Sequence, residues 1–168
     1  LPAAEFAVVI SENKDRVAVY NSPLGAWHFQ EMANAVAPET ALIPLIAQNL
    51  VFVWGDGNYY AYSVMQGKWQ AAPAKQKLKR RLDGPIVSAN MASLVLDDHG
   101  YAFSAFTGTR ENLPIPIAEG NRVAHAGNYI HVTHGDVISA FSAQTGKWSS
   151  INFKLAKPVN WKVEPKPE

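Results

Sequence analysis

Short apolar runs of about five residues recur along this chain, each bounded by Gly, Asn, Asp or Pro, and this length is typical of β-strands rather than helices. In the second quarter of the chain they predict strands at residues 42–47, 50–54, 59–65 and 68–72. The series returns at residues 86–89, 93–96, 101–106 and 111–115, and again at 122–125, 129–133, 137–143 and 147–152. We therefore expect an all-β fold made of similar four-stranded units.

A pattern that occurs four times sets the register of these units. Its anchors are Gly25, Gly67, Gly108 and Gly146, at intervals of 42, 41 and 38 residues. The residue five before each glycine is aromatic (Tyr20, Tyr62, Phe103, Phe141), and the next is small and polar (Asn21, Ser63, Ser104, Ser142). Two residues after the glycine comes Trp27, Trp69, Arg110 or Trp148. Self-similarity at this period is typical of repeat architectures, including propeller blades.

The recurring aromatics predict how the units pack together. Successive side chains on a strand point to opposite faces, so each aromatic lies opposite a smaller neighbour: Val19, Ala61, Ala102 or Ala140. Blades stacked around an axis need a large face against a small one. We predict that Tyr62, Phe103 and Phe141 are buried between blades and that the recurring tryptophans also serve packing.

The segment from Ser139 to Trp148, with the sequence SAFSAQTGKW, resembles the kelch-type repeats of β-propellers and, more loosely, the Thr-Gly-Lys motif of quinoprotein-type blades. The Gly-Gly pair that kelch repeats carry after the second strand is absent here. The resemblance implies a propeller, and no functional residue is carried over from it.

The predicted fold is a β-propeller of four four-stranded blades, closed by a C-terminal strand that pairs with the N-terminal repeat. The repeats occupy about residues 5–32, 41–73, 84–115 and 121–152, and the first lacks an innermost strand. Residues 158–163 have the composition of such a strand, and we expect them to complete the first blade and hide its open edge. Residues 1–163 then form a single domain, followed by a Pro-rich tail at 164–168.

Composition narrows the possible sites and partners. A chain of 168 residues with 48% hydrophobic residues suits one soluble domain, and its net charge of +1 gives no general attraction to nucleic acid. The absence of cysteine excludes disulfides, thiolate nucleophiles and Cys-ligated metals. No apolar run reaches the roughly 20 residues that span a bilayer. The chain starts at Leu1 rather than Met, which is typical of a processed terminus and favours a periplasmic or secreted location.

The histidines of the last repeat are the residues to weigh for metal binding. His125, His131 and His134 lie close in sequence and, with Asp136, offer suitable ligand types. They fall at a strand end, in mid-strand and in a turn, so we expect packing or hydrogen bonding and no metal site. No phosphate-binding loop, nucleophile elbow or zinc-protease motif is found, and we expect no catalytic residue and no cofactor.

The turns between second and third strands place the unusual polar and aromatic residues on one face of the predicted disc. These residues are Trp54, Asp56, Asp98, His99, His134 and Asp136. We expect them to bind a ligand over the axis, against the alternative that they are only solvated turns. Residues 75–82 carry a run of positive charge, in which Lys79, Arg80 and Arg81 would add anion binding at the rim; the alternative is a solvated loop.

These features favour a ligand-binding or protein-binding propeller module whose partner is a protein or a glycan. Two alternatives stay open. One is a small enzyme acting on a carbohydrate or another polar substrate. The other is an assembly subunit, in which two four-blade units join as a homodimer into a larger propeller, or the chain is one section of a longer polypeptide.

Overall fold

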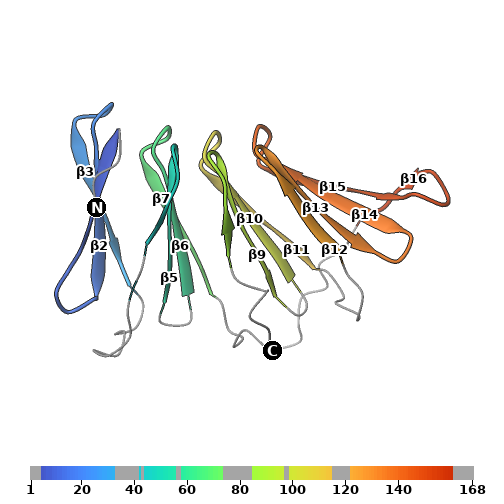
Figure 1. The fold of residues 1–168 in the computed structure, drawn as a ribbon, viewed down its shortest axis with the longest axis horizontal. Coiled ribbons are helices and arrows are strands. Elements are labelled where there is room, and N and C mark those ends of the chain that lie inside the picture. The colour runs from blue at the N-terminus through green and yellow to red at the C-terminus, as the bar shows by residue number, and fades with distance from the viewer. Residues whose placement is uncertain are drawn as a thin grey trace.

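The computed structural model describes residues 5–32, 42, 44–55, 58–73, 85–96, 99–114 and 122–160. Their regular secondary structure is entirely β-strand, in four antiparallel sheets. The sheets stand side by side in chain order, so that the first and last lie at opposite ends of the array (Figure 1). No helix in the described ranges has the length and hydropathy to cross a membrane.

Each sheet is a meander of consecutive strands. Sheet 1 contains β1 (Phe6–Ile10), β2 (Arg16–Asn21) and β3 (Ala26–Glu31). Sheet 2 contains β4 (Leu45–Ile46), β5 (Leu50–Gly55), β6 (Asn58–Ser63) and β7 (Lys68–Pro73). Sheet 3 contains β8 (Ile86–Val87), β9 (Met91–Leu96), β10 (His99–Ser104) and β11 (Thr109–Pro114). Sheet 4 contains β12 (Arg122–Ala126), β13 (Tyr129–His134), β14 (Val137–Ser142), β15 (Lys147–Asn152) and β16 (Lys157–Pro158).

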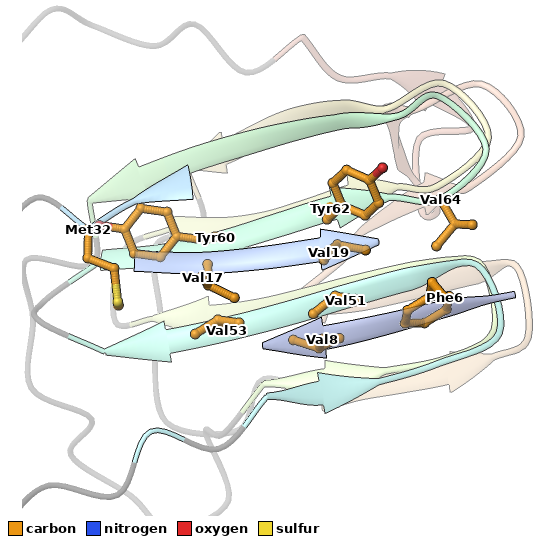
Figure 2. Close-up of a cluster of buried hydrophobic side chains, with 10 residues drawn as sticks. All are labelled: Phe6, Val8, Val17, Val19, Met32, Val51, Val53, Tyr60, Tyr62 and Val64. Carbon is orange, nitrogen blue, oxygen red and sulfur yellow. The ribbon is translucent and has the colours of Figure 1, made fainter. Parts of the chain in front are cut away.

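The recurring aromatics of sheets 2, 3 and 4 each pack on the preceding sheet, which confirms their predicted burial. Tyr62, Phe103 and Phe141 are 0%, 1% and 0% exposed. Tyr62 belongs to the cluster between sheets 1 and 2, drawn in Figure 2. Ala61 and Ala102 lie in the clusters on the opposite side of their sheets, against sheets 3 and 4. The predicted alternation of a large and a small face is therefore present.

In sheets 1, 2 and 3 the small polar residue after the recurring aromatic makes a hydrogen bond to the next sheet. The Asn21 amide donates to the Val64 carbonyl at 2.6 Å, and the Ser63 hydroxyl donates to the Ala105 carbonyl at 2.5 Å. The Ser104 hydroxyl donates in the same way to the carbonyl of Ala143. All three donors are buried, so these bonds satisfy polar groups that the sheet interfaces remove from water.

Two of the three recurring tryptophans, Trp69 and Trp148, also join neighbouring sheets. The Trp69 indole N–H donates to the His28 carbonyl at 3.3 Å, and the Trp148 indole N–H donates to the Glu111 carbonyl at 3.3 Å. The ring of Trp69 lies 5.1 Å from that of Tyr62. Their structural role, inferred from recurrence, fits these contacts.

The recurring glycine ends a tight turn between the last two long strands of each sheet. Gly146 has a φ of 67°, and its N–H donates to the Ser142 carbonyl at 2.8 Å. A Cβ at this position would overlap the side chains of Thr107 and Thr109 in sheet 3. Glycine is needed here because it accepts the left-handed backbone and lets the preceding sheet approach.

The predicted closure by a C-terminal strand is not confirmed within the described ranges. β16 pairs with β15 in the register Ile151↔Pro158, as the fifth strand of sheet 4, while sheet 1 has three strands. The chain reverses directly after β15, where the Leu155 N–H donates to Asn152 Oδ1 at 2.9 Å. Pairing with β15 closes only this short loop, whereas pairing with β1 would carry the chain back past two sheets. Residues 161–163 and the tail lie outside the described ranges.

Candidate binding surface

The predicted ligand residues are only partly described. Trp54 is half-buried near the end of β5 and packs against the core between sheets 2 and 3. His134 ends β13, half-buried, and Asp136 is exposed in the following turn. Trp54 and His134 belong to sheets separated by sheet 3, so no described contact brings them together. The side chain of His99 lies outside the described part of the structure, as do Asp56, Asp98, Lys79, Arg80 and Arg81.

The histidines of sheet 4 do not converge on one point. His125 is paired with Ile130 on the face toward sheet 3, and His131 is paired with Ala124 on the opposite face. Neither ring nitrogen of His125 has a hydrogen-bond partner. Burial lowers the pKa of His125, and the nearby His131 lowers it further. Among the described residues, no group of three or more His, Asp or Glu side chains could hold a metal ion.

A more distinctive surface is the outer face of sheet 1. The strand registers place Val9, Tyr20, Trp27 and Phe29 on this face, which we call the aromatic outer face. Their exposed fractions are 51%, 36%, 49% and 62%. The rings of Tyr20 and Trp27 lie 5.3 Å apart and tilted by 54°. Four large apolar side chains therefore lie together in solvent.

The repeat explains why this face is apolar. Tyr20 and Trp27 occupy the positions that Tyr62 and Trp69 hold in sheet 2, where both belong to the packing against sheet 1. No described strand precedes sheet 1 to cover the equivalent surface. Gly25 shows the same difference, because a Cβ there would meet no atom within 4 Å. The aromatic outer face is thus one half of a sheet interface.

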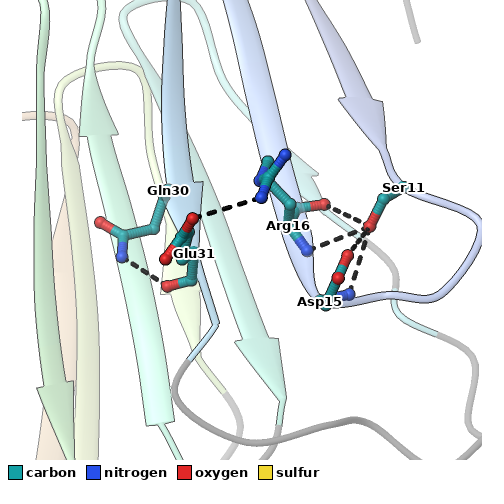
Figure 3. A network of polar contacts seen from close by, with 5 residues as sticks. All are labelled: Ser11, Asp15, Arg16, Gln30 and Glu31. Carbon is teal, nitrogen blue, oxygen red and sulfur yellow. Dashed lines mark hydrogen bonds and ion pairs between the residues drawn. The ribbon is translucent and has the colours of Figure 1, made fainter.

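A polar rim borders the aromatic outer face at the β1–β2 turn (Figure 3). Arg16 and Glu31 are paired across β2 and β3 on this same face, and their side chains form an ion pair at 3.2 Å. In the adjacent turn the Ser11 hydroxyl donates to Asp15 Oδ1 at 2.6 Å and accepts the Arg16 N–H at 3.0 Å. The bond from Ser11 lowers the pKa of Asp15. An apolar centre with a charged rim is the usual anatomy of a protein interface.

The other end of the array also presents an interface-like face. On the outer face of sheet 4, Tyr129 and Ile151 are 49% and 42% exposed. The ring of Tyr129 stacks on that of His131, with centroids 6.2 Å apart. Tyr129 holds the repeat position of Leu50, which sheet 3 covers completely, at 0% exposure.

The sequence contained a signal for the aromatic outer face that the packing prediction did not use. Tyr20 and Trp27 follow the interior pattern, although they belong to the first of the four copies in this sequence. Terminal units of repeat proteins ordinarily carry a polar outer face. Val9 and Phe29 had no such signal, because neither belongs to the recurring pattern.

No protein-family model matches this chain, and no curated protein sequence matches it. Solved structures of propeller type are similar to it. Hsv2 of Kluyveromyces lactis is 13% identical with a TM-score of 0.32, and the match covers 93% of this chain and 59% of Hsv2. AztD of Citrobacter koseri is 15% identical with a TM-score of 0.38, covering 95% of this chain and 47% of AztD.

The dihydro-heme d1 dehydrogenase NirN is 13% identical with a TM-score of 0.41, and the match covers 93% of this chain and 43% of NirN. The chain thus spans about half the length of these solved proteins. At such low TM-scores the likeness adds nothing about function, and the fold rests on the sheets described above.

Proposed function

We propose that this chain is a protein-binding module and that the aromatic outer face of sheet 1 is its binding surface. The observation that carries the proposal is the exposure of Val9, Tyr20, Trp27 and Phe29 together on one sheet face. Exposed apolar groups of this kind mark interaction sites on soluble proteins. Tyrosine and tryptophan are also among the side chains that most often dominate the binding energy of interfaces.

A protein suits this surface better than a small polar ligand. Small molecules bind in concave sites that bury most of their surface, whereas the aromatic outer face is the open side of a sheet. Its polar groups lie at the border, in the Arg16–Glu31 ion pair. A partner with an apolar patch of similar size would cover the aromatic centre and leave this rim in water.

Site-specific photo-crosslinking tests the proposal. A photoreactive phenylalanine analogue replaces Phe29 in the full chain, and the protein is irradiated in an extract of its source cells. We expect protein adducts at this position and few from the same analogue at Asn13, an exposed residue of the β1–β2 turn. Adding Trp27→Lys should remove the adducts at position 29. Equal yields at positions 29 and 13 would contradict the proposal.

A further inference from the structure

We propose that the partner of the aromatic outer face is the outer face of sheet 4 in a second copy of this chain. Two copies would join head to tail. The four sheets of one copy and the four of the other would together form one ring of eight sheets. The inference rests on the proposed function, because it names the partner of the same surface.

Every interface inside the chain joins the same two kinds of face. The leading face of a sheet carries its recurring aromatic, and the trailing face carries the small residue beside it. Tyr62, Phe103 and Phe141 each lie in a cluster shared with the trailing face of the preceding sheet. Within the described ranges one leading face is uncovered, on sheet 1, and one trailing face, on sheet 4. A second copy supplies both missing halves.

The side chains of the two uncovered faces are complementary by the same rule. Ala140 on the trailing face of sheet 4 corresponds to Ala61, the small residue in the cluster that holds Phe103. It would leave room for Tyr20 of the second copy. Tyr129 and Ile151 correspond to Leu50 and Ala72, which are both buried against sheet 3. These apolar positions would meet the aromatic outer face.

Hydrogen-bonding groups at the two ends are complementary as well. Ser142 holds the position of Ser63 and Ser104, whose hydroxyls donate to the next sheet. The matching acceptor on a second copy is the carbonyl of Ser22, which holds the position of Ala105 and Ala143.

In a second hydrogen bond between the copies, the donor would lie on sheet 1 and the acceptor on sheet 4. The Trp27 indole N–H corresponds to that of Trp148, which donates to the carbonyl of Glu111. Its acceptor on a second copy is the carbonyl of Ser149, at the position equivalent to Glu111. Within the described ranges neither the Ser142 hydroxyl nor the Trp27 indole has a partner.

Two copies are enough to close the assembly. Head-to-tail contacts join unlike faces, and they form a ring when the rotation between copies closes and a filament when it does not. Eight sheets lie within the range of about four to eight blades found in closed propellers. Closure by two copies would cover the outer faces of sheets 1 and 4 in both copies. The two contacts would be identical and related by a twofold axis.

Sedimentation of the full chain and of two double variants tests this arrangement. The head variant carries Trp27→Lys and Phe29→Lys, and the tail variant carries Tyr129→Lys and Ile151→Lys. We expect the unaltered chain to be a dimer and each variant alone to be a monomer, with the dissociation constant raised about 30-fold or more. A one-to-one mixture of the variants should form a heterodimer, because one head and one tail remain intact. A control with Glu12→Lys and Asn13→Lys, in the exposed β1–β2 turn, should stay dimeric.

Three results would overturn the inference. A tail variant that stays dimeric would place two copies of sheet 1 face to face. Oligomers that grow with concentration would show an open filament instead of a ring. A monomeric unaltered chain would exclude the second copy, and crosslinks from position 29 to another protein would then leave the proposed function standing. Circular dichroism of each variant separates lost association from unfolding.

Discussion

At the residue scale, Phe103 and Phe29 are the same side chain in opposite environments. Phe103 is 1% exposed between sheets 2 and 3, and Phe29 is 62% exposed on the aromatic outer face. Phe103→Ala should lower the free energy of unfolding by about 3–5 kcal/mol, because it opens a cavity. Phe29→Ala should change it by less than about 1 kcal/mol when measured on monomeric protein. Urea unfolding of both variants provides the comparison, and equal losses would mean that Phe29 is covered.

The recurring serines give a second residue-scale prediction. Ser104→Ala removes the donor to the Ala143 carbonyl in a buried interface and should cost about 1–3 kcal/mol. Ser142→Ala removes a hydroxyl with no described partner, so monomeric protein should keep its stability. If the two copies join as proposed, Ser142→Ala should weaken their association. Thermal melts and sedimentation measure the two effects separately, and a Ser104→Ala protein as stable as its parent would contradict the role of this bond.

His125 makes stability depend on pH in a defined direction. Its pKa in the folded protein lies below the ordinary 6.5, with burial as the main cause, so the unfolded chain takes up the proton more readily. Stability from this group is complete above the unfolded pKa and is lost as the pH falls through it. Unfolding free energies should therefore drop as the pH falls below about 6.5, the ordinary pKa of histidine. His125→Gln should reduce the pH dependence of the unfolding free energy. An unchanged pH dependence in this variant would mean that other groups cause it.

At the element scale, the strands themselves were predictable because each apolar run ends at a strong turn signal. β15 matches its predicted limits, and the other long strands of sheets 2, 3 and 4 differ from theirs by one or two residues. What the sequence did not determine was the partner of the last strand. The composition of a segment predicts that it forms a strand, but the loop length and the available sheet edges determine which strand it pairs with. Here β16 pairs with β15, the strand that directly precedes it.

The candidate surface was less predictable for a related reason. Tyr20 and Tyr62 have the same place in the repeat, yet one is 36% exposed and the other is 0% exposed. The difference comes from the presence of a preceding sheet and not from the residue or its flanking sequence. A repeat pattern predicts which face of a strand is suited to pack against another sheet. Whether such a sheet is present depends on the three-dimensional structure.

The recurring turn allows the interface contribution to be measured directly. Gly25 and Gly146 have φ values of 62° and 67°, so an alanine suffers similar backbone strain at either position. Only at Gly146 would its Cβ also overlap the preceding sheet, at Thr107 and Thr109. In monomeric protein Gly25→Ala should cost about 1 kcal/mol and Gly146→Ala about 1–3 kcal/mol more. Chemical denaturation of the two variants tests this prediction. Equal losses in the free energy of unfolding would show that the side chains of sheet 3 move aside without loss of stability.

At the scale of the whole molecule, the open array predicts an uneven distribution of stability. Sheets 2 and 3 are covered on both faces, whereas sheets 1 and 4 are each covered on one. Regions with fewer buried contacts open at lower free energy. In dilute protein, hydrogen exchange should be slowest in β5, β6, β9 and β10 and faster in β2 and β14. Rising protein concentration should slow exchange in β2 and β14 if copies associate, and uniform protection in monomeric protein would contradict this distribution.

The direction in which the buried aromatics point has a consequence for the chain during its synthesis. Tyr62, Phe103 and Phe141 all pack on the sheet that precedes their own. The sheet that each aromatic contacts has therefore been translated before the aromatic leaves the ribosome. Every sheet also comes from one continuous stretch of chain and needs no segment that is still to be translated. Folding can therefore advance with translation, with each new sheet using the last as a template.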